Sequence, residues 1–129
     1  MTFLKNWKTN WELKSLNFNE LFKVVSDVIN KQLDEIEKED IKLDANLIID
    51  YEADSVDIVA ILLYLEDIFK NASSANRIVV PTDKLGQIVL VEDILDIIYE
   101  VLLDIEKKMD SWSPIKPDYS ALEKRQKLN

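Results

Sequence analysis

A near absence of glycine most limits what this chain can fold into. The 129 residues include Gly 1 and Pro 3. Antiparallel β folds and folds that cradle phosphate in a glycine-rich loop need many turn residues, and several of these need a positive φ. Apolar residues make up 47% of the chain, which is enough for one hydrophobic core at this length. The sequence therefore predicts one mostly helical domain.

The absence of histidine and cysteine limits the chemistry. Cys 0 excludes disulfides, thiolate metal sites and a cysteine nucleophile, and His 0 excludes triads in which imidazole is the base. One acidic run lacks the glycine turn of a calcium loop: Asp34, Glu35, Glu37, Glu39, Asp40 and Asp44. We interpret this run as solvated surface and predict no metal site, leaving a carboxylate hydrolase or a calcium protein as a third alternative.

Charge divides the chain into three parts. The formal net charge is −9, and residues 18–108 hold 9 bases and 21 acids, a net of −12. The N-terminal extension, residues 1–17, carries +2, and the C-terminal extension, residues 109–129, carries +1. Because the central domain is this acidic, we expect it to repel nucleic acid and anionic membranes and to favour partners with basic surfaces.

No apolar run is long enough for a signal peptide or a membrane span. The longest, Ile58 to Leu65, has eight residues, far fewer than a spanning helix needs. We therefore expect no membrane span and a cytoplasmic location.

Apolar spacing predicts three long helices and a short one. The first begins after Asn17, which can form a capping box with Glu20, and runs to about Glu37. A long ordered loop follows, over residues 38–53. Asp54 then caps a second helix that runs to Phe69 or Lys70.

The remaining segments complete a small helical bundle. A one-turn helix starts at Pro81 and stops at Gly86, and the last helix covers residues 91–108. The second helix is apolar nearly all round, so it is either the most buried element or presents one face to a partner. Apolar side chains in both extensions either dock on the domain or form a partner-binding appendage: Phe3, Trp7, Trp11, Trp112, Ile115, Tyr119 and Leu122.

One constellation indicates a modification site. Ser55 directly follows the capping Asp54, so it lies at the positive end of the helix dipole, where a phosphodiester is favoured. The chain has no histidine to activate this serine as a nucleophile. If Ser55 is modified, another enzyme must supply the base.

These surroundings resemble the acyl carrier protein family. The family's second helix opens on Asp-Ser-Leu and ends in Glu-x-x-Phe, and here Asp54-Ser55-Val56-Asp57 leads to Glu66-Asp67-Ile68-Phe69. The resemblance covers Phe18 to about Lys108. Further positions agree with the family pattern: Asp50, Ala53, Val80, Pro81, Ile88, Val91, Asp96 and Ile98.

The resemblance implies an all-α, acyl-carrier-like four-helix bundle in which Ser55 takes 4′-phosphopantetheine from coenzyme A. A separate phosphopantetheinyl transferase would load it, with Asp54 fixing the helix start and assisting recognition. Acyl groups would then travel as thioesters to acyl-transferring or condensing enzymes with basic surfaces. The implied partner-binding residues are Asp50, Val56, Asp57, Glu66 and Asp67. The same analogy implies an acyl cavity inside the bundle. Ordinary core packing would also explain the apolar residues that would line it: Leu62, Leu65, Val80, Leu85, Ile88, Ile94 and Leu95.

Departures from the family pattern indicate a specialised carrier. Glu52 stands where the family usually has glycine, Val56 where it has leucine, and the middle of the second helix lacks an acid. We therefore expect a dedicated pathway of fatty-acid, lipid or polyketide-type biosynthesis. The alternative is a non-enzymatic interaction module that keeps the bundle but is never modified. We expect a monomer, with a dimer through the extensions left open.

Overall fold

The computed structural model of the chain describes residues 11–69, 82–108, 115–120 and 122. Within these residues all regular secondary structure is helical, with three α-helices and two 3₁₀ segments. An isolated antiparallel bridge joins Asn46 to Leu90. The predicted all-α class is therefore confirmed.

Helix α2 (Phe18–Gln32) begins where the sequence predicts and ends earlier. Asn17 Oδ1 accepts from the Glu20 amide at 2.8 Å, and Glu20 Oε1 accepts from the Asn17 amide at 3.1 Å, which completes the capping box. The predicted end near Glu37 is wrong. The chain turns after Gln32, and Asn30 Nδ2 donates to the Ile36 carbonyl at 2.7 Å. Leu33 stays buried beyond the helix, so the apolar spacing continues although the helix does not.

Helices α3 (Ser55–Ile68) and α4 (Val91–Lys107) agree with the predicted ranges. The short predicted helix is a 3₁₀ segment, η2 (Thr82–Gln87), and the long loop before α3 holds another, η1 (Lys38–Asp40). A carboxylate in the first turn of α4 caps the start of this helix: Asp93 Oδ2 accepts from the amides of Val89 and Leu90 at 3.0 and 2.8 Å.

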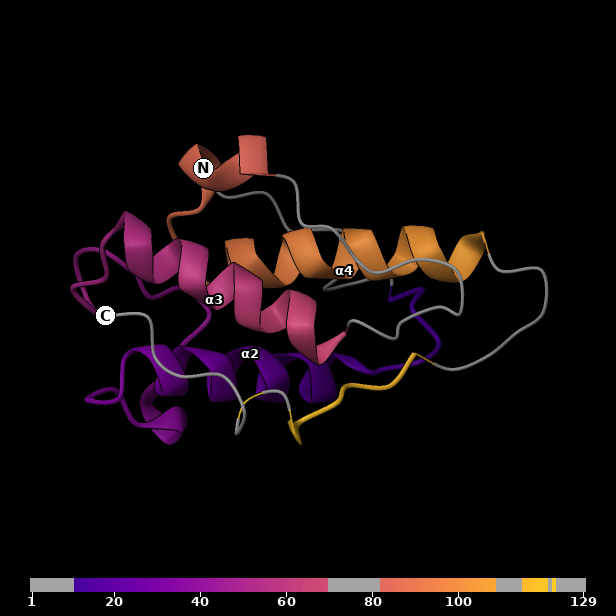
Figure 1. Ribbon diagram of the computed structural model, residues 1–129, viewed down its shortest axis with the longest axis horizontal. Coiled ribbons are helices and arrows are strands. Elements are labelled where there is room, and N and C mark those ends of the chain that lie inside the picture. The colour runs from indigo at the N-terminus through magenta and orange to yellow at the C-terminus, as the bar shows by residue number, and fades with distance from the viewer. Residues whose placement is uncertain (1–10, 70–81, 109–114, 121, 123–129) are drawn as a thin grey trace.

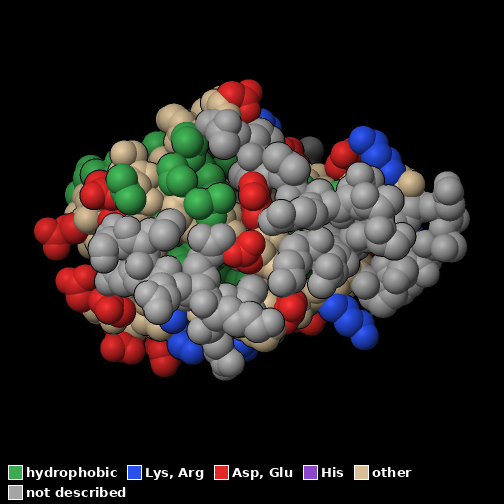
Figure 2. Space-filling model, viewed as in Figure 1, with side chains coloured by type: hydrophobic (Ala, Val, Ile, Leu, Met, Phe, Trp, Pro, Cys, Tyr) green, Lys and Arg blue, Asp and Glu red, His purple; other side chains and the backbone are tan. Residues whose placement is uncertain are grey.

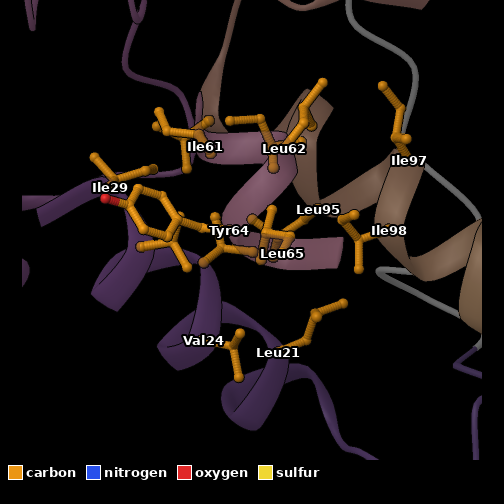
Figure 3. Packing of buried hydrophobic residues seen from close by; sticks show 14 of the residues in the cluster. Leu21, Val24, Ile29, Ile61, Leu62, Tyr64, Leu65, Leu95, Ile97 and Ile98 are labelled. Carbon is orange, nitrogen blue, oxygen red and sulfur yellow. The ribbon is translucent and has the colours of Figure 1, made fainter. Parts of the chain in front are cut away.

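The three α-helices pack around one core, with α2 in contact with both α3 and α4 (Figure 1). Side chains from all three helices meet there, as the close view in Figure 3 shows. Leu21 from α2, Leu65 from α3 and Leu95 from α4 are each fully buried. Buried apolar area of this kind is the main favourable term in folding.

Both extensions contribute to this core. Leu13, Leu16 and Ile115 are buried at 3%, 4% and 1% exposure, in the same cluster as the helices. The Trp11 ring lies 4.7 Å from the Tyr99 ring, centroid to centroid, and Leu122 packs against the core. Docking of the extensions is thus confirmed for Trp11, Ile115 and Leu122, while Phe3, Trp7 and Trp112 lie outside the described residues.

A carboxylate on α4 joins the two extensions. Glu106 accepts hydrogen bonds from the Lys14 amide at 2.8 Å and from both the amide and the hydroxyl of Ser15. The Ser15 hydroxyl oxygen in turn accepts from the Ile115 amide at 2.8 Å. Segments a hundred residues apart in sequence are therefore held together beside the last turns of α4.

From Ile115 the chain crosses to the other helices. We call residues 115–120 and 122 the C-terminal strap; it is the yellow segment in Figure 1. The Asp118 amide donates to the carbonyl of Ile68, the last residue of α3, at 2.8 Å. The Lys23 ammonium lies 4.8 Å from the centre of the Tyr119 ring, which tethers the strap to α2. The hydrogen bond of Lys23 to Asp27 raises the pKa of that lysine, and burial raises the pKa of Tyr119.

Among the described residues, none of the helices is both long enough and apolar enough to cross a membrane.

Candidate functional site

Ser55 is the first residue of α3 and is exposed. Asp54, the preceding residue, caps the helix: its Oδ1 accepts from the Asp57 amide at 2.9 Å, and Asp57 Oδ2 accepts from the Asp54 amide at 3.0 Å. This reciprocal pair fixes where the helix starts. Local sequence therefore determines the position of Ser55, since both caps lie within three residues of it.

The cap leaves two backbone donors at the helix start. The first four amides of an α-helix have no partner within the helix, and here the capping box engages those of Asp54 and Asp57. The hydrogen bonds among the described residues leave the amides of Ser55 and Val56 without an acceptor. Together with the helix dipole, these two donors favour an anion attached at Ser55.

The loop before Ser55 is held by its own hydrogen bonds. Asn46 Oδ1 accepts from the amides of Ile48 and Ile49 at 3.0 and 2.9 Å, and Asp50 Oδ2 accepts from the Asn46 amide at 2.8 Å. The Leu47 amide donates to the Val89 carbonyl at 2.9 Å, which ties the loop to the segment before α4. The serine therefore follows an anchored loop.

Glu52 has an unusual backbone in this loop. Its φ is 58°, and it is the one non-glycine residue with a positive φ in the part of the chain that the structure describes. An L side chain pays a steric penalty in this left-handed region, which glycine avoids. In the sequence Glu52 is visible only as a departure from the family pattern, and the backbone reveals this strain.

The predicted partner-binding residues separate into two groups. Asp50 and Val56 are exposed, and Glu66 and Asp67 are partly exposed. Asp57 instead is only 5% exposed, and its two carboxylate oxygens accept from Gln32 Nε2 and the Asp54 amide. Asp57 therefore lies inside the bundle and does not offer its carboxylate to a partner's surface.

Apolar side chains lie exposed beside Ser55. Val56, Val59 and Leu63 follow each other at helical spacing on the outer face of α3, with 53%, 37% and 36% exposure. We call these three residues the outer stripe. Figure 2 shows hydrophobic side chains gathered over the first turns of α3, with acidic side chains at their margin. The all-round hydrophobicity of this helix was the sequence signal for such a face, although it did not identify Val59 or Leu63.

Ile48, Ile49 and Val89 extend the apolar surface on the loop side. Their exposures are 54%, 76% and 43%, and the hydrogen bond between Leu47 and Val89 holds the two segments side by side. Sequence reasoning missed these residues, because apolar side chains in a long loop are normally expected to point inward.

Most of the predicted cavity residues meet in the core. Leu85 is partly buried and packs against this core, and Val80 lies outside the described residues. The buried members of the set are Leu62, Leu65, Ile88, Ile94 and Leu95.

Metal ligands do not gather in the described part of the chain, where no three acidic side chains are placed to hold an ion. Comparisons with protein-family models, with curated proteins and with solved structures found no match to this chain.

Proposed function

We propose that this protein is a carrier in which Ser55 bears 4′-phosphopantetheine. The observation that carries the proposal is an exposed serine on the first turn of α3, with two unengaged backbone amides beside it. A phosphodiester on the Ser55 hydroxyl would sit at the positive end of the helix, where its charge is stabilised.

The loading step needs a second enzyme. Ser55 Oγ forms a bond to the phosphorus on the pantetheine side of coenzyme A, and the bond from that phosphorus to the nucleotide half breaks. The serine proton passes to a base on the transferase, because this chain has no histidine to accept it. The thiol at the end of the arm then carries acyl groups, which explains how a chain without cysteine serves thioester chemistry.

Glu52 supports the assignment independently. The acyl carrier family usually has glycine at this position, and here the backbone has the positive φ for which glycine is the favoured residue. A glutamate with this φ at the position of the family's glycine is what the proposal expects if the two loops share one shape. In the proposed four-helix carrier fold, η2 would correspond to the short third helix.

The surface around Ser55 suits partner enzymes. The outer stripe supplies apolar contact and Asp50 supplies negative charge, while Glu66 and Asp67 add negative charge at the far end of α3, for a partner with a basic surface. The buried cavity candidates would open to admit the acyl chain, and the pathway would be a dedicated one in fatty-acid, lipid or polyketide-type biosynthesis.

The same outer stripe favours a second candidate, an interaction module that binds through α3 and carries no arm. One experiment separates the two. The purified protein is incubated with coenzyme A, magnesium and a broad-specificity phosphopantetheinyl transferase, and its intact mass is measured.

The carrier proposal predicts a mass gain of one phosphopantetheine, which Ser55→Ala abolishes. Ser26→Ala, a change at a buried serine on α2, serves as the matched control and keeps the gain. No gain in either the wild type or this control, under conditions that load an ordinary carrier, would favour the module.

A further inference from the structure

A buried side chain at the end of α2 contacts the first turn of α3. Gln32 is the last residue of α2 and is fully buried, and its Nε2 donates to Asp57 Oδ1 at 2.8 Å. The two residues are 25 positions apart in the sequence, and both lie away from solvent. This hydrogen bond therefore joins two helices inside the core.

Asp57 is also hydrogen-bonded to Asp54, the residue before Ser55. Its other oxygen accepts from the Asp54 amide at 3.0 Å, and its own amide donates to Asp54 Oδ1 at 2.9 Å. We call Gln32, Asp57 and Asp54 the brace. It links α2 to the residue that fixes where α3 begins.

Burying the Gln32 amide is not required for packing. Burial of a polar group is unfavourable unless it is hydrogen-bonded, and a leucine or methionine would fill similar space without that cost. Among the described residues, Gln32 Oε1 has no hydrogen-bond partner, so the bond to Asp57 is the polar contact that offsets the burial. A hydrogen bond to a carboxylate is stronger than one between neutral groups.

We propose that Gln32 is a positioning residue for Ser55. By holding the Asp57 carboxylate, it fixes the direction of the first turn of α3 relative to α2, and with it the hydroxyl that the transferase must reach. The capping box alone sets where the helix starts, whereas Gln32 sets how that start is oriented in the bundle. This role rests on the proposed function, since it concerns the loading of Ser55.

The first test replaces Gln32 with an apolar residue of similar length. We expect Gln32→Met to lower kcat for loading about tenfold, because a hydrogen bond to a charged group is lost, and to change KM for the carrier little. Amide hydrogen exchange should become faster at Asp57 and Ile58, whose amides donate to the side chain and the carbonyl of Asp54, while the far end of α3 keeps its protection. Val24→Ala removes buried volume from α2 about two turns before Gln32, and it should lower global stability and leave kcat unchanged.

The second test exchanges the two functional groups of the pair. Gln32→Glu places two carboxyl groups in contact and should reduce kcat further than Gln32→Met. Combining Gln32→Glu with Asp57→Asn puts the carboxylate at position 32 and the amide at position 57, so a hydrogen bond can form again in the reverse direction. The double variant should load faster than Gln32→Glu alone.

The outcomes distinguish this role from the proposed function. Wild-type loading with an unchanged kcat in Gln32→Met, or a double variant no better than Gln32→Glu, would overturn the positioning role and leave the carrier intact. If the wild type is not loaded at all, the carrier proposal and the role of Gln32 in loading both fail. Hydrogen exchange at Asp57 and Ile58 would then decide alone whether Gln32 fixes the first turn.

Discussion

The two ends of α3 are built differently. At the N-terminal end Ser55 is exposed, and the next residue, Val56, is 53% exposed although it is apolar. At the C-terminal end Ile68 and Phe69 are fully buried, and the Ile68 carbonyl accepts from the Asp118 amide of the C-terminal strap. One helix of nearly uniform hydrophobicity thus has one covered end and one open end.

Hydrophobicity of the helix does not explain this difference; the segments around it do. At the Ile68 end, Asp118 of the C-terminal strap donates to the helix's last carbonyl, whereas the side chains of the outer stripe remain exposed. Exposed apolar side chains on a monomer often mark a contact surface. The strap end therefore contributes to stability, and under the proposed function the Ser55 end contributes to recognition.

The largest effect is expected at the covered end. Ile115→Ala removes a side chain that is 1% exposed and should lower the free energy of unfolding by about 2 kcal/mol or more. Loading of Ser55 under native conditions should stay unchanged, as measured by intact mass over time. Lys116→Ala, at the exposed neighbour, is the control and should shift stability by less than about 0.5 kcal/mol in denaturant unfolding. A strap that contributes nothing to the core would make the two variants equal.

At the open end, the Asp54 cap should contribute less to stability than Ile115 does, and its main effect should be on the position of Ser55. Asp54→Ala removes the acceptor of the Asp57 amide and should cost about 1 kcal/mol in denaturant unfolding. Asp54→Asn retains a capping oxygen and should keep most of that stability. If both variants are equally destabilised, the carboxylate charge rather than the cap accounts for the loss.

Glu52 offers a smaller effect of opposite sign. Glu52→Gly relieves the positive φ of 58°, while glycine also increases the entropy of the unfolded chain, so we expect a net gain of about 0.5 kcal/mol. Glu52→Ala keeps a Cβ at the same position and should show no such gain. Equal stabilisation by glycine and alanine would show that the glutamate side chain, rather than the backbone, carries the cost.

The outer stripe should have the smallest effect on stability. Val59→Ser should change the free energy of unfolding by less than about 0.5 kcal/mol, since Val59 is 37% exposed, while weakening association with the transferase. Ile58→Ser, at the buried neighbour, should instead destabilise the fold strongly. Unchanged transferase affinity in Val59→Ser would remove the stripe from the docking surface.

Local signals allowed much of the fold to be predicted from the sequence. The Asn17 and Asp54 caps and the apolar spacing give the starts of α2 and α3, because both features act within a few residues. The apolar spacing predicts an end of α2 near Glu37, which is wrong, because the turn after Gln32 buries Leu33 just as a continued helix would. Apolar spacing does not distinguish those two cases.

Contacts between distant residues could not be predicted in this way. The family resemblance implies a partner-binding role for Asp57 as one of the acids on the second helix, yet Gln32 holds this carboxylate inside the bundle. The link from Glu106 through Ser15 to Ile115 joins three distant segments, and no local pattern indicates it. Such pairs become visible only when the helices are placed.

Whether Ser55 carries a phosphopantetheine arm is tested most directly by the intact mass of the full chain isolated from its native cell, with Ser55→Ala expressed alongside. The account predicts a wild-type species heavier than the bare chain by one phosphopantetheine, with or without an acyl group, and a Ser55→Ala protein at the bare mass. A wild-type protein found only at the bare mass, from cells whose other carriers are loaded, would contradict it.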